Sequence, residues 1–472
     1  MSKEIEAFIK DYLKEIEENN AAIFAGAGLS AASGHVDWKH LLKDFADELN
    51  LDIAKETDLV SLAQYHLNKN GHNRHALSQK IINEFHHGKK PNTNHEVLAK
   101  LPIATYWTTN YDKLIEKSLD QVGKITDVKY TNEHLAKTVH GRDVILYKMH
   151  GDVDHADHAI ISKDQYEKYY NTHGAYINTL SGDLVSKTFL FIGFSFTDPN
   201  LEYILSRIRV TFQNHQRNHY CIFREIKQEA GESFDDFEYK KIKQALAISD
   251  LLRFNIHVLL VKEYTDITKI LKEIENRFKR NTIYISGSAH NYGAWKTEIA
   301  EYFIANLSKE LIRNNFKIVS GFGLGIGSSV INGVLEEVYI NRNEKLKDQL
   351  MLRPFPQGVK GKETWHTYRN DMISYAGISI FIFGNKIVDG TVVFADGVRK
   401  EFEIAKEQNI LLVPVGATGS MGKELYSELL DNFSKYYGSN DQIEYFKELG
   451  NEDASPDELI KSILTFITKI IK

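Results

Sequence analysis

The sequence predicts an α/β protein of two domains, each built around a parallel sheet. Short apolar runs alternate with segments of helical period along most of the chain, and this alternation is typical of parallel sheets covered by helices. A pattern of strand, glycine turn and helix also starts twice, near residue 21 and again near residue 282. At 472 residues the chain is longer than one hydrophobic core ordinarily serves.

The first domain is expected to open with an amphipathic helix and a short apolar strand. Apolar side chains at helical spacing indicate the helix: Phe8, Ile9, Tyr12, Leu13 and Ile16. The strand is predicted at 21–24, the turn at Gly26-Ala27-Gly28, and a second helix from about Ser30. Further strands of the same parallel sheet are predicted at 104–108, 144–149, 188–193 and 219–223.

The second domain is expected to repeat this architecture after a helical segment at 266–280. Its strands are predicted at 282–285, 317–320, 377–383 and 410–415. A glycine-rich loop at 321–327 and a helix from about Ser328 follow the second of them. We therefore divide the chain into domains 1–280 and 281–472.

Composition excludes several classes of protein. The net charge of −6 gives no general attraction to nucleic acid or to an anionic membrane. The single cysteine, Cys221, cannot form an internal disulfide or a structural zinc site, so we expect no metal. The charged N-terminal segment is not a secretory signal, and no apolar run is long enough to span a bilayer. A cytoplasmic location is expected.

Two glycine-containing turns of the first domain follow predicted strands. The first is Gly26-Ala27-Gly28-Leu29-Ser30, and the second is Gly193-Phe194-Ser195, which continues as Phe196-Thr197-Asp198-Pro199-Asn200. Glycine lets a backbone approach a pyrophosphate closely, and a helix N-terminus supplies N–H donors to it. The simpler interpretation of the first segment is a plain glycine turn. In the second segment, the simpler interpretation of Asp198-Pro199-Asn200 is the start of a helix.

Two further segments place polar side chains directly after strands. They are Thr108-Thr109-Asn110-Tyr111-Asp112 and Lys148-Met149-His150-Gly151-Asp152. An amide followed by a carboxylate can hold ribose hydroxyls or a water, and a histidine there can act as a base near neutral pH. The simpler interpretations are a helix cap for Asp112 and a hydrogen-bonded structural role for His150.

In this order and spacing the four segments resemble the sirtuin family over roughly residues 15–265. The resemblance implies a Rossmann-like, NAD-binding domain in which Asn110 and His150 form the catalytic pair. It also implies that five residues line the cofactor pocket: Ala25, Gly26, Ser30, Asp112 and Ser195.

Two departures from the sirtuin pattern bear on the reaction. Sirtuin deacylases carry a four-cysteine zinc module, which a chain with one cysteine cannot build. The usual Asp-Phe-Arg after the first turn is Asp37-Trp38-Lys39 here. We therefore expect cleavage of the nicotinamide–ribose bond of NAD with water as acceptor, and an NAD-dependent protein deacylase is the alternative.

The second domain offers several groups suited to a phosphate-bearing ligand. Arg369 and Lys386 can neutralise phosphates, and Glu401 can accept hydrogen bonds from ribose hydroxyls. Alternatively, both cations are solvated surface charges and Glu401 compensates a helix dipole. Residues 282–470 resemble the SLOG family of nucleotide-sensing domains, but without the Pro-Gly-Gly-x-Gly-Thr-x-x-Glu signature of its phosphoribohydrolases. A binding role is therefore expected.

A sirtuin-like domain followed by a SLOG domain resembles the NAD-consuming effectors of Thoeris anti-phage defence. The resemblance implies activation by a cyclic ADP-ribose isomer that a TIR-domain protein produces, and a homotetramer or larger assembly. The implied effector site consists of Ser288, Arg369, Lys386, Glu401, Gly416 and Ala417. The remaining alternatives are a non-catalytic nucleotide sensor that acts by assembly and, more weakly, a DNA-binding protein.

Overall fold

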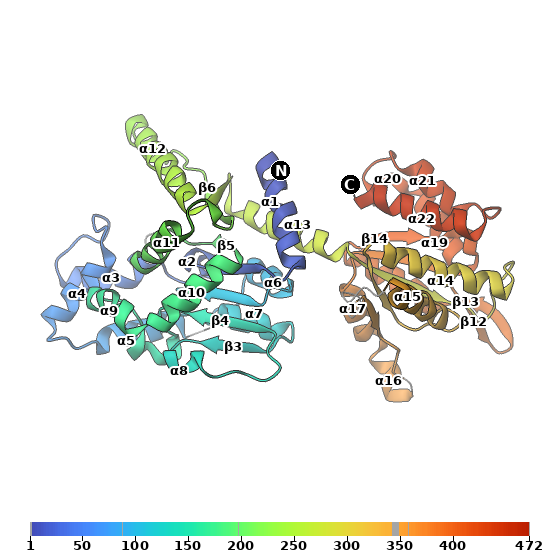
Figure 1. The fold of residues 1–472 in the computed structure, drawn as a ribbon, viewed down its shortest axis with the longest axis horizontal. Coiled ribbons are helices and arrows are strands. Elements are labelled where there is room, and N and C mark those ends of the chain that lie inside the picture. The colour runs from blue at the N-terminus through green and yellow to red at the C-terminus, as the bar shows by residue number, and fades with distance from the viewer. Residues whose placement is uncertain (1, 87, 197, 342–348, 357, 472) are drawn as a thin grey trace. The chain divides into compact units, whose positions relative to one another are not determined.

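The computed structural model describes the chain except residues 1, 87, 197, 342–348, 357 and 472. Thr197, part of the second glycine-containing segment, therefore lies outside the described residues. The chain divides into two compact units, Met1–Glu275 and Asn276–Lys472 (Figure 1). The division falls inside helix α13 (Tyr264–Lys279), whereas the sequence analysis divided the chain after residue 280.

The first unit is built on a seven-stranded parallel sheet with the order β3-β4-β2-β1-β5-β6-β7. Its strands are β1 (Ala21–Ala25), β2 (Thr105–Thr108), β3 (Thr126–Lys129), β4 (Val144–Lys148), β5 (Thr188–Ile192), β6 (His219–Arg224) and β7 (Ile256–Val261). Strands β2, β3 and β4 all lie on one side of β1, and β5, β6 and β7 lie on the other, so the strand order reverses between β1 and β5. In open parallel sheets, ligands bind beyond the carboxyl ends of the strands at such a reversal.

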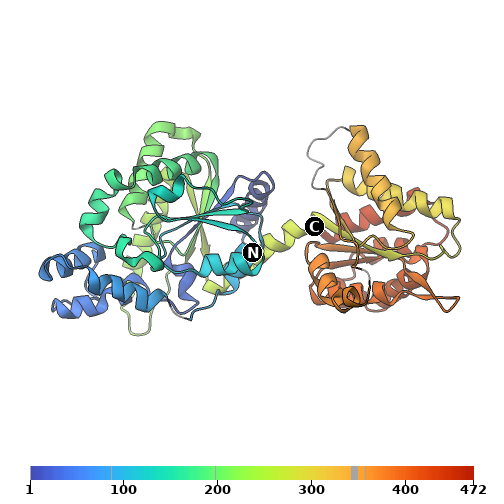
Figure 2. The same ribbon diagram turned by 90° about the horizontal axis from the view of Figure 1, so that it is seen from below.

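Helices lie on both faces of this sheet (Figure 2). The larger ones are α1 (Lys3–Glu17), α3 (Trp38–Glu48), α4 (Leu59–Lys69), α5 (His75–Phe85), α9 (Lys163–Thr172), α10 (Gly174–Ser186), α11 (Pro199–Phe212), α12 (Phe234–Leu251) and α13. The shorter ones are α2 (Ala27–Ala31), α6 (Thr93–Lys100), α7 (Leu114–Gln121), α8 (Asn132–Leu135) and the 3-10 turns η1 (Val153–His158), η2 (Gln213–His215) and η3 (Leu252–Phe254).

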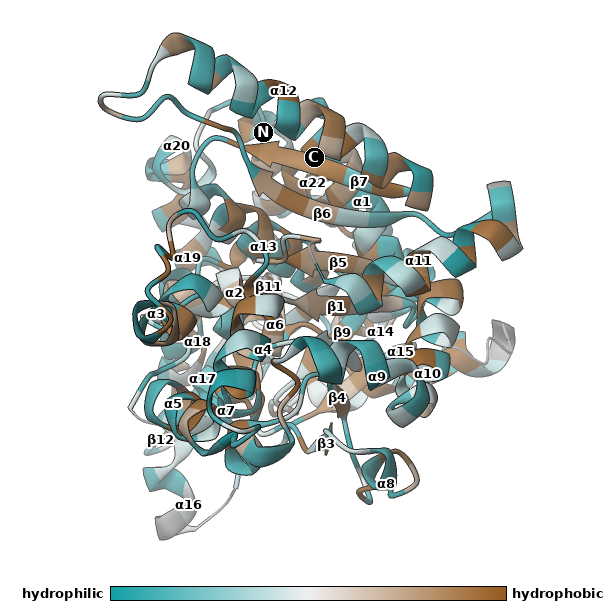
Figure 3. Ribbon diagram, turned by 90° about the vertical axis from the view of Figure 1, so that its left-hand side faces the viewer, coloured by the Kyte–Doolittle hydropathy of each residue, from teal (hydrophilic) through white to brown (hydrophobic). Residues whose placement is uncertain are grey.

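The central strands are buried along their whole length. All positions of β1 and of β5 are buried, which agrees with the hydrophobic colour along β5 in Figure 3. Phe24 of β1 stacks on Phe191 of β5 with ring centroids 5.2 Å apart. Burial on both faces explains why these strands appear in the sequence as continuous apolar runs.

Three features of the first unit differ from the sequence analysis. The helix expected from about Ser30 begins at Ala27, because Gly26 already serves as its N-cap residue. Strand β3 was not predicted, since its inward-facing residues are the charged Asp127 and Lys129. Strand β7 was also missed, although its sequence is apolar.

The second unit contains a five-stranded parallel sheet with the order β10-β9-β8-β11-β14. The strands are β8 (Thr282–Ser288), β9 (Lys317–Ser320), β10 (Leu350–Leu352), β11 (Ile378–Phe383) and β14 (Leu411–Pro414). The helices are α14 (Thr297–Arg313), α15 (Gly327–Asn341), α16 (Val359–Glu363), α17 (Trp365–Ser374), α18 (Asp396–Glu407), α19 (Ser420–Asp431), α20 (Phe433–Tyr437), α21 (Ile443–Lys447) and α22 (Pro456–Ile471), with 3-10 turns η5 (Gly416–Thr418) and η6 (Glu448–Gly450). Here the strand order reverses between β8 and β11.

The segment around Lys386 is a β-hairpin, which was not among the predicted elements. Its strands are β12 (Asn385–Val388) and β13 (Thr391–Phe394), paired antiparallel. The turn residues Asp389 and Gly390 both have positive φ, at 49° and 78°. An Asp-Gly turn between β-branched residues is a strong hairpin signal, and it was present in the sequence.

Within the described residues, no helix is both long and apolar enough to cross a membrane. The same part of the chain contains no cluster of three or more His, Cys, Asp or Glu side chains arranged to hold a metal ion. Cys221 is a buried free thiol.

Candidate active site

Two glycine turns meet where the strand order of the first sheet reverses. The Gly26 N–H donates to the Ile192 carbonyl at 2.9 Å, and the Gly28 N–H donates to the Gly193 carbonyl at 2.9 Å. A Cβ at Gly26 would lie 2.4 Å from the Gly193 oxygen, and one at Gly193 would lie 2.2 Å from the Leu29 nitrogen. Glycine is therefore required at both positions, because a side chain at either one would prevent the two turns from packing against each other.

Asn110 lies directly after β2 and is tied to the first glycine turn. Its Nδ2 donates to the Gly26 carbonyl at 3.1 Å and to Ser30 Oγ at 3.2 Å. Its backbone N–H donates to Thr108 Oγ1, which in turn donates to the Ala25 carbonyl. Because both Nδ2 protons have acceptors, the carboxamide oxygen is the atom left to accept from a ribose hydroxyl or a water.

His150 follows β4, and its side chain is 2% exposed. Its Nε2 lies 3.0 Å from Asp198 Oδ2, within ion-pair distance. Its Nδ1 lies 3.4 Å from the Tyr166 hydroxyl. The imidazole therefore has a carboxylate on one side and a phenol on the other, an arrangement that can stabilise an imidazolium during proton transfer.

Asp198 has two roles. It is the N-cap residue of α11 and accepts from the N–H groups of Asn200 and Leu201 at 2.9 and 3.0 Å. Burial by itself would raise the pKa of this carboxyl, but the His150 charge and these hydrogen bonds outweigh burial and lower the pKa. From the sequence, only the role of Asp198 at the helix start was predicted, because His150 is distant from it in the chain.

These elements surround an open cavity of about 750 Å³. Of the predicted residues, His150 and Ser195 line it. Four other predicted residues are outside the described lining and belong to a hydrogen-bonded group that includes the neighbours of the lining residue Ala27: Ala25, Gly26, Ser30 and Asn110. A cavity of this size can hold a dinucleotide-sized ligand in part or in whole.

Asp112 is directed into the protein. Its Oδ1 accepts from the Leu114 N–H at 2.9 Å at the start of α7, and its side chain is buried. It is not among the residues that line the cavity within the described part of the chain. The geometry therefore favours the helix-start interpretation of Asp112, and its role in binding NAD remains a prediction.

Several cavity residues were not predicted as site residues. They come from the starts of α3, α4, α9 and α11, and they include Trp38, Lys39, Asp58, Lys163, Tyr166 and Asp198. Trp38 and Lys39 belong to the segment that departs from the sirtuin pattern. That segment could therefore have been proposed from the sequence as part of the site. Lys163 and Tyr166 belong to a helix that carries no motif of its own.

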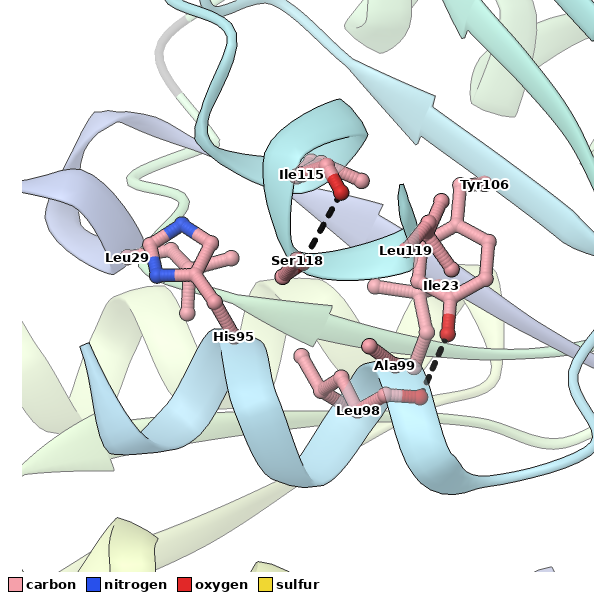
Figure 4. A pocket seen from close by; sticks show the side chains of 9 residues that line it. All are labelled: Ile23, Leu29, His95, Leu98, Ala99, Tyr106, Ile115, Ser118 and Leu119. Atoms are coloured by element: carbon pink, nitrogen blue, oxygen red, sulfur yellow. Dashed lines mark hydrogen bonds between the residues drawn. The ribbon is translucent and has the colours of Figure 1, made fainter. Parts of the chain in front are cut away.

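Helix α6 supports the first glycine turn from behind. Asn92, its N-cap residue, donates to the Leu29 carbonyl at 2.8 Å and to Ser33 Oγ at 3.1 Å. His95 of the same capping box lies with Leu29 and Ser118 around a small buried cavity (Figure 4). Burial, first of all, lowers the pKa of His95 to about 4, so its imidazole is neutral at physiological pH.

In the second unit, the predicted effector residues Ser288, Gly416 and Ala417 lie at carboxyl ends of strands. Ser288 Oγ donates to the Asn385 carbonyl at 3.0 Å, and the Ala417 carbonyl accepts from Trp295 Nε1 at 3.0 Å. Lys386 lies on the hairpin and pairs with Asp396.

Arg369 and Glu401 form a buried pair. Their side chains are 9% and 8% exposed, and Arg369 Nε lies 3.3 Å from Glu401 Oε1. The guanidinium lies over the rings of Phe355 and Trp365, at 4.7 and 5.4 Å from the ring centroids. Ser286 Oγ donates to the other Glu401 oxygen at 2.6 Å. Arg369 is therefore not the solvated surface charge of the simpler interpretation, whereas the side chain of Lys386 is 41% exposed. A role of these residues in ligand binding remains a prediction.

The glycine turns at a reversal point, with a paired imidazole and carboxylate beside them, define a nucleotide-binding α/β protein of the SIR2-like class. Residues 104–245 match the SIR2-like domain family. Residues 266–470 match the family described as Sir2- and TIR-associating SLOG.

The chain is also similar over almost its whole length to proteins named NAD(+) hydrolase ThsA. It is 55% identical to the protein of Bacillus cereus (strain MSX-D12), over 99% of this chain and 98% of that one. Identity is 49% to the protein of Acinetobacter baumannii (strain 532279), over 96% of each chain, and 44% to that of Enterococcus faecium, over 98% of each. The chain belongs to the ThsA family.

Proposed function

We propose that this chain is an NAD+ glycohydrolase that converts NAD to nicotinamide and ADP-ribose. Its ThsA relatives bear the name NAD(+) hydrolase. The observation that carries the proposal is the convergence of His150, the Asn110 segment and both glycine turns around one cavity. The substrate is NAD itself, and no metal is required by the groups in this site.

The chemistry follows from the leaving group and the two polar side chains. The nicotinamide ring of NAD is cationic and takes the electron pair of the glycosidic bond as it leaves, so it departs as a neutral molecule and needs little acid assistance. The positive charge develops on the ribose in an oxocarbenium-like transition state. The Asn110 oxygen is suited to orient a ribose hydroxyl or the attacking water. His150 accepts the proton that the hydroxyl or water loses, and the Asp198 carboxylate stabilises the imidazolium that results.

We further propose that the second unit regulates this activity. A cyclic ADP-ribose isomer, made by a TIR-domain protein, would bind beyond the carboxyl ends of β8 and β11 and switch on hydrolysis. In a bacterial cell the resulting loss of NAD would act as Thoeris anti-phage defence. The SLOG match, the reversal of strand order and the cations Arg369 and Lys386 near it support this proposal.

A homo-oligomer, a tetramer or larger, in the cytoplasm is also part of the proposal. Helix α12 supports assembly, since only Leu251 of it is buried. Its exposed apolar side chains include Phe234, Tyr239, Ile242 and Leu246, which are 57–67% exposed, and such surfaces commonly mark protein interfaces.

The test is to identify the products of NAD formed by the purified full-length chain, with and without cyclic ADP-ribose isomers. Equal amounts of nicotinamide and ADP-ribose, raised by one isomer, would support a regulated hydrolase. If an acyl-lysine peptide were deacylated with matching nicotinamide release, the chain would be a deacylase instead. If NAD were bound but never cleaved under any ligand, a non-catalytic sensor would be the better description.

A further inference from the structure

We propose that Lys148 is a positioning residue for the reaction: its buried ammonium group joins the segment that carries Asn110 to the segment that carries His150. This inference rests on the proposed NAD hydrolysis. Lys148 is not among the described residues that line the cavity, so it acts through its neighbours.

Two of the contacts of Lys148 hold the backbone directly after Asn110. Its Nζ donates to the Tyr111 carbonyl at 3.2 Å and to the Asp112 carbonyl at 2.6 Å. The Tyr111 carbonyl also accepts from the Val153 N–H at 3.0 Å. One carbonyl oxygen therefore binds both the ammonium group and the loop after β4.

The other two contacts are with carboxylates. Lys148 Nζ lies 2.6 Å from Asp152 Oδ2, two positions beyond His150. It lies 3.0 Å from Glu116 Oε1 in the first turn of α7. An ammonium group has only three protons, so these four acceptors satisfy it completely.

The cost of burying these charges indicates that the arrangement fixes the positions of the two segments more than it stabilises the fold. The side chains of Lys148 and Asp152 are 0% and 2% exposed. Taking both charges out of water is costly, and apolar residues of similar volume often replace such pairs without loss of stability. A buried pair can instead impose one arrangement on the segments that it joins. Here the two segments carry the residues assigned to the chemistry, where a displacement of about 1 Å can cost roughly 100-fold in rate.

Lys129 provides a matched control on the neighbouring strand β3. It is also a buried lysine, 3% exposed, and its Nζ lies 2.7 Å from Asp127 Oδ1. It donates in addition to the Lys137 carbonyl. Neither partner belongs to a segment that carries Asn110 or His150, so Lys129→Met removes a buried charge without touching the proposed site.

The experiment compares the full-length wild type with Lys148→Met, Lys148→Met/Asp152→Asn and Lys129→Met. Methionine keeps much of the lysine volume. The single substitution takes the ammonium group away from two carboxylates, those of Glu116 and Asp152, and the double substitution removes the more deeply buried of these two charges. For each protein, kcat and KM for NAD are measured in the presence of the cyclic ADP-ribose isomer that activates the wild type. Hydrogen exchange by mass spectrometry is followed over 108–113 and 150–161 in the absence of NAD.

We expect both Lys148 variants to lose at least about 10-fold in kcat, with KM changed less than about 3-fold, and to exchange faster in both segments. Lys129→Met should keep kcat within about 2-fold of the wild type. Wild-type kcat or wild-type exchange in the double variant would overturn the inference, as would an equal loss in Lys129→Met. If the wild type cleaved no NAD, the proposed function would fail, and the exchange rates alone would decide whether Lys148 joins the segments.

Discussion

At the scale of single residues, the candidate site depends on pairs of side chains that the sequence separates widely. His150 meets Asp198 and Asn110 meets Ser30. The sequence analysis singled out Asn110, His150 and both glycine turns, because each follows a strand at the edge where parallel sheets bind ligands. The helix cap of Asp112 was available from the sequence as the simpler interpretation. That Asp198 faces His150 could not be predicted, since it depends on how loops from different strands pack.

The pairing of His150 with Asp198 predicts a specific effect of Asp198→Asn. Asparagine also caps helices well, so α11 should be preserved while the carboxylate charge is lost. We expect kcat for NAD cleavage to fall about 10- to 100-fold with KM little changed, because general-base assistance is worth roughly 100- to 10,000-fold in total.

The control for this measurement is Asp58→Asn. Asp58 caps α4 by accepting from the Ser61 N–H, and it also lines the cavity. Steady-state kinetics should show kcat close to that of the wild type for this variant. Equal losses in the two variants would mean that the charge of the cavity, and not the contact with His150, matters.

Among the helices and strands, those marked by an apolar run were mostly predicted from the sequence. Those with charged buried positions or marked by a turn were missed. Strands β1, β2, β4, β5 and β6 were anticipated from their apolar runs. Strand β3 was not, because its buried positions hold the Asp127–Lys129 ion pair. The hairpin after β11 was missed although Asp389-Gly390 marks its turn. The start of α2 was misplaced because tertiary packing of Gly26 against Gly193 determines it.

The lowered pKa of His95 in α6 predicts that the free energy of unfolding decreases in acid. Its pKa is lowered from 6.5 to about 4 in the folded chain. Between these values the unfolded chain binds a proton that the folded chain does not, so stability falls as the pH decreases from about 6.5 towards 4. From pH 7 to pH 5 the contribution is about 2 kcal/mol at about 1.4 kcal/mol per pH unit.

His95→Gln should abolish this contribution, because glutamine can keep the capping box and does not titrate. Urea unfolding of both proteins at pH 7 and pH 5 measures the difference. We expect the variant to lose about 2 kcal/mol less than the wild type between these pH values. The same loss in both proteins would assign the acid sensitivity to other buried groups.

At the scale of the whole molecule, each unit places its candidate ligand site where its strand order reverses. A ligand of the second unit can activate the first only if it binds the active arrangement more tightly than the resting one. The sequence indicated both sites through their glycine turns, but not that Arg369 and Glu401 are already paired in the structure.

This pairing refines the test of regulation. Arg369→Ala alone would leave Glu401 as a buried unpaired charge, at a cost of roughly 3–5 kcal/mol. Arg369→Met/Glu401→Gln removes both charges, and we expect it to fold while losing at least about 10-fold in the stimulation by the activating isomer. Arg399→Ala, which removes a partly exposed pair with Glu428 on the same unit, should respond normally. A normal response of the double variant would move the effector site elsewhere.

The role of His150 in NAD cleavage is tested by the rate of nicotinamide release from NAD by wild type, His150→Ala and His155→Ala, each measured with the same cyclic ADP-ribose isomer present. His155 lies on η1, five positions after His150, and contacts Tyr130, so its loss controls for removal of another imidazole from the same segment of the chain. We expect His150→Ala to slow release by at least about 100-fold and His155→Ala to keep the wild-type rate. Undiminished release by His150→Ala would contradict the assignment of NAD cleavage to this cavity.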